Sequence, residues 1–350
     1  MSDLIAQQGG DEERWAALCQ WEMRRAVEHL GETAPLLAEM ANYHLGWTDD
    51  FAADVRYRGK RIRPLIAMAC AAAVGGDEAA VRSAALAAAV ELLHNFTLVH
   101  DDIQDQSEQR RHRPTVWARW GTAQAINAGD ALYAAAHLAL LGAAEAGAKA
   151  EDVLDLVRGF EATTLEIVSG QVLDLQFESR TDVTPDEYIA MITGKTARIV
   201  EYAAGAGAWI GGAGPEIAGD LAGYGMALGI GYQIHDDLLG TFGDASETGK
   251  PAGDDIRRKK GSLPVLLLHE RGTADERAYI DHAYRSEHVD DAMVEQIIAM
   301  MRTHEIEIEM LSRVETYHAS ALAALERTGL PAERTAFLVT LTTRLQHRTS

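Results

Sequence analysis

Apolar residues recur at helical spacing along most of this chain, and the alternation typical of strands is almost absent. Residues 84–105, 126–147 and 151–176 place apolar side chains at i, i+3, i+4 and i+7, with charged residues between them. Thr184 followed by Pro185 is typical of a helix start, with the threonine as cap and the proline in the first turn. Many segments carry apolar residues on more than one side, which indicates central helices of a large bundle.

This pattern predicts an all-α fold of roughly ten or more helices. A length of 350 residues suits one large domain or two ordinary ones. Because no shift in composition marks a boundary, we expect a large single-domain helical bundle over residues 13–350, after a disordered N-terminus over residues 1–12.

Acidic residues outnumber basic ones, and the formal net charge is −21. Such acidity argues against nucleic acid as a partner, because phosphate contacts need clustered Lys and Arg. The only two cysteines, Cys19 and Cys70, fit a reducing compartment better than a disulfide framework. The start of the chain lacks the apolar core of a secretory signal, and no apolar run reaches the roughly 20 residues that cross a bilayer. We therefore expect a cytoplasmic protein without a transmembrane segment.

Two similar stretches, LVHDDIQD and QIHDDLLG, each place adjacent aspartates inside an apolar helical segment. On a helix, Asp101 and Asp105 point the same way, with Asp102 at the edge of that face. Carboxylates this close repel one another unless a cation lies among them, and such oxygen ligands suit Mg²⁺ together with substrate phosphates. Asp236 and Asp237 are candidates for an opposing acidic wall. For either stretch alone, a solvated helix end or a capping cluster is the simpler interpretation.

Three basic clusters accompany the two aspartate pairs. Arg110 and Arg111 follow the first pair, and a second cluster precedes it, comprising Lys60, Arg61 and Arg63. The cluster after the second pair comprises Lys250, Arg257, Arg258, Lys259 and Lys260. Metal ions combined with Arg and Lys side chains are what catalysis needs when negative charge builds up on a departing phosphate. The arrangement therefore predicts a site for a diphosphate.

Six motifs, taken in their order along the chain, make it resemble the trans-isoprenyl diphosphate synthases, the polyprenyl synthetase family. They are GKRIRP (59–64), ELLHNFTLVHDDIQD (91–105), RRHRPTV (110–116), GQVLDL (170–175), GKTA (194–197), and YQIHDDLLGTFGD with GKPAGDDIRRKKGSLP (232–264). The resemblance implies a helical bundle of the isoprenoid synthase type around a central cavity, a homodimer, and about three Mg²⁺ ions. The implied substrates are isopentenyl diphosphate and an allylic prenyl diphosphate.

The resemblance also assigns roles to individual residues. The metal ligands would be Asp101, Asp105 and Asp236, supported by Asp102 and Asp237. The allylic diphosphate would be contacted by Arg110, Lys195, Thr196, Gln233, Lys250 and Lys260. The isopentenyl diphosphate would be contacted by Lys60, Arg63, His94 and Arg111, in a region that Gln171 and Asp174 also line. Catalysis would depend most on Asp101, Asp105, Arg110, Lys195 and Asp236.

The implied reaction is a Mg²⁺-dependent head-to-tail condensation by a prenyltransferase. An allylic C–O bond breaks to give a resonance-stabilised carbocation and pyrophosphate. The double bond of isopentenyl diphosphate attacks the cation, and the resulting intermediate then loses a proton to pyrophosphate, the base that the resemblance implies. Mg²⁺ and the basic side chains lower the barrier because they stabilise the leaving group more than the ground state.

Product length should depend on the residues beneath the first aspartate motif. Phe96 lies five residues before Asp101, about 7 Å deeper along the helix, where it would form a floor. The small Thr97 leaves room that an aromatic side chain would close. This pattern resembles family members that make geranylgeranyl diphosphate. We therefore expect that product, with farnesyl diphosphate as the second choice.

The second aspartate motif departs from the family pattern, because Gly240 stands where the family has its third aspartate. Asp244 could replace that carboxylate only if the helix has ended and the loop folds back.

Three alternatives to the synthase remain open. A terpene cyclase of the same fold would need the acidic walls but not the basic residues assigned to a second diphosphate. An HD-type metal phosphohydrolase, suggested by the His-Asp pairs beginning at His100 and His235, would need more histidine ligands. A non-catalytic partner subunit is suggested by Gly240 and opposed by the intact first motif.

Overall fold

The computed structural model is about 80% helical, which confirms the predicted all-α class. The structure describes residues 10–32, 34–48, 61–111, 113–243 and 252–347. The chain divides into two compact units, which are described separately below. The single domain expected from the sequence stays a prediction. Of the N-terminus expected to be disordered, residues 1–9 lie outside the described residues, and Asp11 and Glu12 belong to the first turn of α2.

The first unit comprises Met1–Thr164, Tyr202–Ala222 and Leu330–Thr335. Its helices are α2 (Asp11–Glu28), η1 (His29–Gly31), α3 (Pro35–His44), α4 (Ile62–Gly75), α5 (Asp77–Arg82), α6 (Ala84–Gln104), α7 (Val116–Trp120) and α8 (Thr122–Leu141). Between α6 and α7, the loop that holds Arg110, Arg111 and Arg113 (the basic loop) forms an antiparallel pair of short strands, β1 (Gln109–Arg110) and β2 (Arg113–Pro114).

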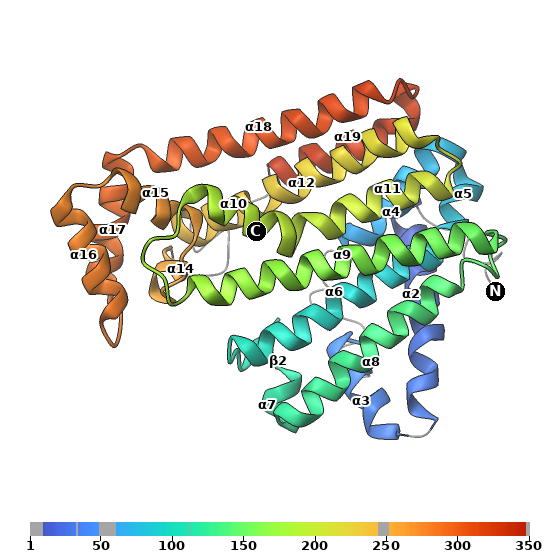
Figure 1. The fold of residues 1–350 in the computed structure, drawn as a ribbon, viewed down its shortest axis with the longest axis horizontal. Helices are drawn as coiled ribbons and strands as arrows, with labels where there is room; N and C mark the ends of the chain where they lie inside the picture. The colour runs from blue at the N-terminus through green and yellow to red at the C-terminus, as the bar shows by residue number, and fades with distance from the viewer. Residues whose placement is uncertain (1–9, 33, 49–60, 112, 244–251, 348–350) are drawn as a thin grey trace. The chain divides into compact units, whose positions relative to one another are not determined.

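Helix α6 is the central helix of this unit, and residues 84–93 are all buried. It packs against α2, α4 and α8, and the long contact with α8 is visible in Figure 1. The two helices approach closely at Gly129, where a Cβ would collide with the ring of His100. On α11 (Arg198–Ile210), a Cβ at Gly207 would likewise collide with the carbonyl oxygen of Ala67 of α4. The glycine at the crossing of α6 and α8 therefore lets the two helices pack closely one residue before Asp101.

The second unit comprises Leu165–Glu201, Gly223–Gly329 and Ala336–Ser350. Its helices are α10 (Pro185–Ile192), η3 (Thr193–Ala197), α14 (Asp254–Arg257), α15 (Leu263–Arg271), α16 (Ala274–Arg285), α17 (Asp291–Thr303) and α18 (Ile306–Arg327). Buried side chains of these helices form one apolar cluster that includes Ile256, Leu263 and Met301. The predicted start of α10 is confirmed, because Thr184 and Glu187 form a capping box there.

Four further helices contain the divisions between the units: α9 (Ala150–Phe177), α11 (Arg198–Ile210), α12 (Pro215–Phe242) and α19 (Ala332–Gln346). Cys19 and Cys70 are both free and buried, as expected for a chain without a disulfide framework. Among the described residues, no helix combines the length and the apolar character needed to cross a membrane.

Candidate active site

The first aspartate motif lies at the C-terminal end of α6, in the first unit. Asp101 is half-buried, Asp102 is buried with 2% of its surface exposed, and Asp105 is exposed. The helix ends here because Gln106 has a left-handed backbone, with φ 50°. The amide of Asp105 still donates to the carbonyl of Asp101 at 2.8 Å. The motif therefore offers two accessible carboxylates one turn apart, while the third turns inward.

The buried Asp102 is paired with the basic loop that follows. Arg110 Nε donates to Asp102 Oδ1 at 2.8 Å. The other carboxylate oxygen, Oδ2, is buried and has no hydrogen-bond partner among the described residues. Burial raises the pKa of Asp102 to about 6, although the neighbouring Arg110 acts in the opposite direction. A buried acceptor of this kind favours a cation close to the motif.

The basic loop itself is held by α3. Strands β1 and β2 pair Arg110 with Arg113, and Arg111 occupies the turn between them with φ 52°. Arg113 is buried, and its guanidinium lies 4.8 Å from the centre of the Tyr43 ring. The Tyr43 hydroxyl donates to the carbonyl of Pro114 at 2.8 Å. The hairpin thus holds the two predicted phosphate contacts, Arg110 and Arg111, close to the aspartates of α6.

Two histidines, His44 and His94, lie among these arginines, and only His94 was predicted from the sequence. His44, at the end of α3, lines a small pocket with Arg110 and Arg111. Burial and the surrounding guanidinium groups lower the pKa of His44 well below its usual value, and the same causes lower the pKa of His94. Both imidazoles are therefore neutral near pH 7, and each can donate a hydrogen bond without adding to the positive charge.

A buried carboxylate, Glu91, balances part of this positive charge. Glu91 lies on α6 with 4% of its surface exposed, and Asn95 Nδ2 donates to its Oε1 at 3.3 Å. Burial raises its pKa, while the guanidinium of Arg63 is the strongest of several that oppose the shift. The predicted Arg63 is half-buried in the first turn of α4. Sequence reasoning missed Glu91 because a single glutamate on a helix usually faces solvent.

In the second unit, the glycines of the GQVLDL and GKTA motifs let two segments touch. A Cβ on Gly170 of α9 would collide with the backbone nitrogen of Lys195, and one on Gly194 would lie 2.9 Å from the carbonyl oxygen of Glu166. Lys195 belongs to η3, a single wide π-turn of the kind often found at functional sites. Its Nζ donates to Asp174 Oδ2 at 2.6 Å. The two motifs therefore place a lysine and a carboxylate together, although the sequence analysis assigned Asp174 to the isopentenyl diphosphate and Lys195 to the allylic diphosphate.

The second aspartate pair is linked to the same turn by a chain of hydrogen bonds. Thr196 Oγ1 donates to Gln233 Oε1 at 3.3 Å, and Gln233 Nε2 donates to Asp237 Oδ1 at 3.1 Å. The hydroxyl of Tyr188, which was not predicted, donates to Asp237 Oδ2 at 2.7 Å. Burial raises the pKa of Asp237 to about 7 even though both hydrogen bonds act to lower it. Asp236, by contrast, is exposed.

The departure at Gly240 has a structural counterpart on α14. The carboxylate of Asp255 occupies the space that a side chain at position 240 would need, because a Cβ there would collide with Asp255 Oδ2. Asp255 has 8% of its surface exposed and pairs with Lys260, whose Nζ lies 2.9 Å from Oδ1. The predicted phosphate contact Lys260 is thus held by a carboxylate close to the second aspartate pair. Asp244, weighed as a substitute for the missing aspartate, lies outside the described residues.

The predicted floor residue Phe96 faces a partner from another helix. Its ring centre lies 5.0 Å from that of Tyr133 on α8 and 4.8 Å from that of His100. The hydroxyl of the neighbouring Thr97 donates to the carbonyl of His94 at 2.8 Å, so its polar end is used within α6. Tyr133 could not be identified from sequence, since nothing local indicates which residue of α8 meets α6.

Some predicted residues remain to be placed. Lys60 and Lys250 lie outside the described residues, and Gln171 is half-buried on α9. Within the described part of the chain, no group of three or more His, Cys, Asp or Glu side chains is arranged to hold a metal ion.

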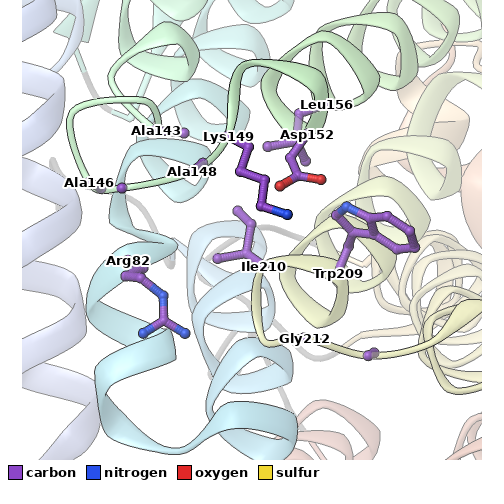
Figure 2. Close-up of a pocket in the computed structure, with 12 residues that line it drawn as sticks. Arg82, Ala143, Ala146, Ala148, Lys149, Asp152, Leu156, Trp209, Ile210 and Gly212 are labelled. Atoms are coloured by element: carbon purple, nitrogen blue, oxygen red, sulfur yellow. The ribbon is translucent and has the colours of Figure 1, made fainter.

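A separate hollow of about 370 Å³ lies elsewhere in the first unit. Figure 2 shows Lys149, Asp152 and Trp209 facing one another there, with Arg82 standing apart. Arg82 precedes α6 at the end opposite to Asp101, so the hollow is not part of the aspartate site.

Comparisons with known proteins agree on one family. A family model described as polyprenyl synthetase matches residues 47–301. A (2E,6E)-farnesyl diphosphate synthase of Mycobacterium tuberculosis is 43% identical over 239 residues, which cover 68% of this chain and 65% of that relative. A geranylgeranyl diphosphate synthase of Saccharolobus solfataricus is 40% identical over 252 residues, which cover 71% and 74% of the two chains. The match thus spans slightly less than two thirds of the mycobacterial relative's length.

Solved structures that superpose on this chain are also named as prenyl diphosphate synthases. A geranylgeranyl pyrophosphate synthetase from Pyrococcus horikoshii superposes with a TM-score of 0.85 at 31% identity, covering 95% of this chain and 96% of that one. A decaprenyl diphosphate synthase from Rhodobacter capsulatus gives a TM-score of 0.82 at 30% identity, covering 100% of both chains.

Proposed function

The chain belongs to the polyprenyl synthetase family, as its motifs indicated, and from this we propose that it is a prenyltransferase. The proposed reaction joins isopentenyl diphosphate head to tail with an allylic prenyl diphosphate and releases pyrophosphate. One observation carries the proposal: in each aspartate pair the second residue is buried and bonded to polar side chains, while the first remains more accessible. Asp102 and Asp237 are thus held in place by hydrogen bonds, while Asp101 and Asp236 beside them are more accessible and can bind a cation.

Members of the family generally depend on Mg²⁺. The donor set fits that ion, because Asp101, Asp105 and Asp236 offer hard oxygen ligands and the buried acceptor Asp102 Oδ2 has no hydrogen-bond partner in the described part of the chain. The absence of a ready three-ligand cluster among the described residues is compatible with Mg²⁺, which usually takes one or two carboxylates plus substrate phosphates. When bound, about three such ions would offset the negative charge that develops on the leaving diphosphate.

The remaining steps fall to side chains of this protein. Arg110, Lys195 and Lys260 are each paired with a carboxylate, so their positions are set before an allylic diphosphate arrives. Such preorganised cations stabilise charge on the leaving group without reorganising during the reaction. Thr196 and Gln233 add hydrogen-bonding groups beside Lys195 in the second unit. The predicted contact Lys250 would complete this set.

We assign isopentenyl diphosphate to the cluster around Arg63, Arg111 and His94, with Lys60 as a further contact. The neutral His94 would donate a hydrogen bond there, and the buried Glu91 keeps the arginines from repelling one another. This second cationic cluster favours a synthase over a cyclase, since a cyclase binds only one diphosphate.

The relatives also bear on product and assembly. They include farnesyl, geranylgeranyl and geranylfarnesyl diphosphate synthases, and geranylgeranyl diphosphate lies in the middle of that range. We propose it as the product, and the cytoplasm as the location. A homodimer is supported by exposed apolar residues that share one face of α9, namely Leu154, Leu165, Val168 and Val172.

The proposal is tested by incubating the protein with Mg²⁺, isopentenyl diphosphate and each of dimethylallyl, geranyl and farnesyl diphosphate, followed by chromatography. Geranylgeranyl diphosphate should accumulate, and chelation of Mg²⁺ should abolish it. Asp101→Asn should lower the rate by at least about a hundredfold, whereas Asp155→Asn, on an exposed part of α9, should not. Hydrocarbon without consumption of isopentenyl diphosphate would favour a cyclase, free phosphate would favour a hydrolase, and no reaction would favour a non-catalytic subunit.

A further inference from the structure

Phe96 is the first of a row of aromatic rings in the first unit. The centre of its ring lies 5.0 Å from that of Tyr133, which lies 6.4 Å from Phe160 in a stacked arrangement. Phe160 in turn meets Tyr202 at 6.1 Å. These four rings come from α6, α8, α9 and α11, so the wall next to Phe96 is built by several helices.

A polar cluster holds Tyr133 in this row. Its hydroxyl donates to Glu161 Oε2 at 2.6 Å. The other oxygen of Glu161 contacts Nε2 of His137, which lies one turn further along α8. His137 Nδ1 and the carbonyl oxygen of Tyr133 are 2.9 Å apart, and the two rings meet edge to face at 4.6 Å. Glu161 therefore ties both aromatic residues of α8 to α9.

The bond between Tyr133 and Glu161 is stronger than an ordinary hydroxyl bond, because its acceptor is ionised. Burial acts to raise the pKa of Glu161, but the hydrogen bonds from Tyr133 and His137 outweigh it and lower the pKa. Burial and the adjacent carboxylate raise the pKa of Tyr133 to about 12. At neutral pH the phenol is thus a donor and the carboxylate an acceptor, so the ring is fixed in one orientation.

We propose that Glu161 and His137 are positioning residues for product length, because they hold the Tyr133 ring against Phe96 as the second half of the floor. The inference deepens the proposed prenyl transfer and rests on it. A growing prenyl chain that reaches Phe96 would meet two rings, one from α6 and one from α8. Without Glu161, the Tyr133 hydroxyl loses its charged acceptor and keeps its contact with Thr164. The ring can then adopt other rotamers, and the gap that it fills becomes available to the chain.

The role is separable from stability. The Glu161 side chain is 44% exposed and that of His137 is 27% exposed, so truncating Glu161 leaves no sealed cavity. A merely structural role would change the thermal midpoint, whereas a positioning role changes the number of isoprene units in the product. Product length is therefore the decisive measurement.

The test compares the products of the wild type with those of Glu161→Ala, Tyr133→Phe, the double variant and Tyr133→Ala, all supplied with farnesyl diphosphate, isopentenyl diphosphate and Mg²⁺. Glu161→Ala and Tyr133→Phe should each move the main product up by at least one isoprene unit. The double variant should move it no further than either single change, because both remove the same hydrogen bond. Tyr133→Ala, which removes the ring, should give the longest product.

Two matched control variants test whether product length depends on the Tyr133–Glu161 hydrogen bond itself or on any nearby acid or hydroxyl. Asp155→Ala removes an exposed acid of α9 that pairs with Arg158, and Tyr202→Phe removes a hydroxyl that donates to the carbonyl of Leu156. Neither should change the product. Should Glu161→Ala fail to fold, Glu161→Gln keeps an acceptor for Tyr133 and should retain the wild-type length.

The outcomes are distinguishable. Wild-type protein that makes no prenyl product would overturn the proposed function and this inference with it. Wild-type condensation with unchanged product length in both single variants, or with additive shifts in the double variant, would overturn the positioning role alone.

Discussion

Gly170 offers a sharp test of how the second unit places Lys195. Substituting alanine for glycine inside a helix normally stabilises it by about 0.5–1 kcal/mol. Here the new Cβ would collide with the Lys195 nitrogen and lie 2.9 Å from both the Lys195 Cα and the carbonyl oxygen of Met191. All three are backbone atoms, so η3 must move away from α9. Such overpacking costs about 1–3 kcal/mol, which leaves a net loss between about 0 and 2.5 kcal/mol, with a mid-range value of about 1 kcal/mol.

Gly170→Ala should therefore lower the thermal midpoint by a few degrees. It should also displace Lys195 from Asp174, and an error of about 1 Å in a catalytic group can cost about a hundredfold in rate. We expect condensation to slow by about ten- to a hundredfold, measured at saturating substrates together with calorimetry. Gly219→Ala is the matched control, because a Cβ on this exposed helical glycine meets nothing within 4 Å and should stabilise the protein. Wild-type activity and midpoint in Gly170→Ala would refute the reasoning.

Further predictions concern other parts of the two units. The pKa of His44 is lower in the folded state than in the unfolded state, so folding favours the neutral imidazole and stability should fall as the pH drops below about 6.5. His44→Gln should therefore flatten the acid side of a plot of thermal midpoint against pH. An unchanged slope would contradict this. Gly240→Ala should displace the Asp255 carboxylate and disturb its ion pair with Lys260. Because Lys260 is a proposed contact of the allylic diphosphate, we expect the KM for that substrate to rise several-fold. An unaltered KM would show that the carboxylate has room to shift. Phe96→Ala should lengthen the product, and an identical product profile would remove Phe96 from the floor.

Local patterns were sufficient for the all-α class and for the family, whereas the roles of the individual site residues stay predictions. Apolar periodicity predicts α6 and α9, and the Thr184 cap marks the start of α10 correctly. The order of six motifs also points to the right family, because those motifs hold the residues whose chemistry the reaction needs.

Residues that act through tertiary contacts were missed. His44 and Tyr133 lie on helices distant in sequence from the motifs that they contact, so no spacing within a motif includes them. Asp255 lies inside a quoted motif, yet its contact with Gly240 depends on where the chain returns after α12. Glu91 resembles any surface glutamate until burial and the arginines around it are known. Such contacts are set by packing, which local periodicity does not encode.

The position of the first aspartate motif at the C-terminal end of α6 has a consequence for the order of ligand capture. The backbone carbonyls at a helix C-terminus carry roughly half an elementary negative charge, which adds to that of Asp101 and Asp105. A diphosphate arriving bare would be repelled by this end of the helix, whereas one already complexed with divalent ions would be attracted. The protein would therefore select the salt of its substrate rather than the free anion, and its apparent affinity should follow the concentration of that salt.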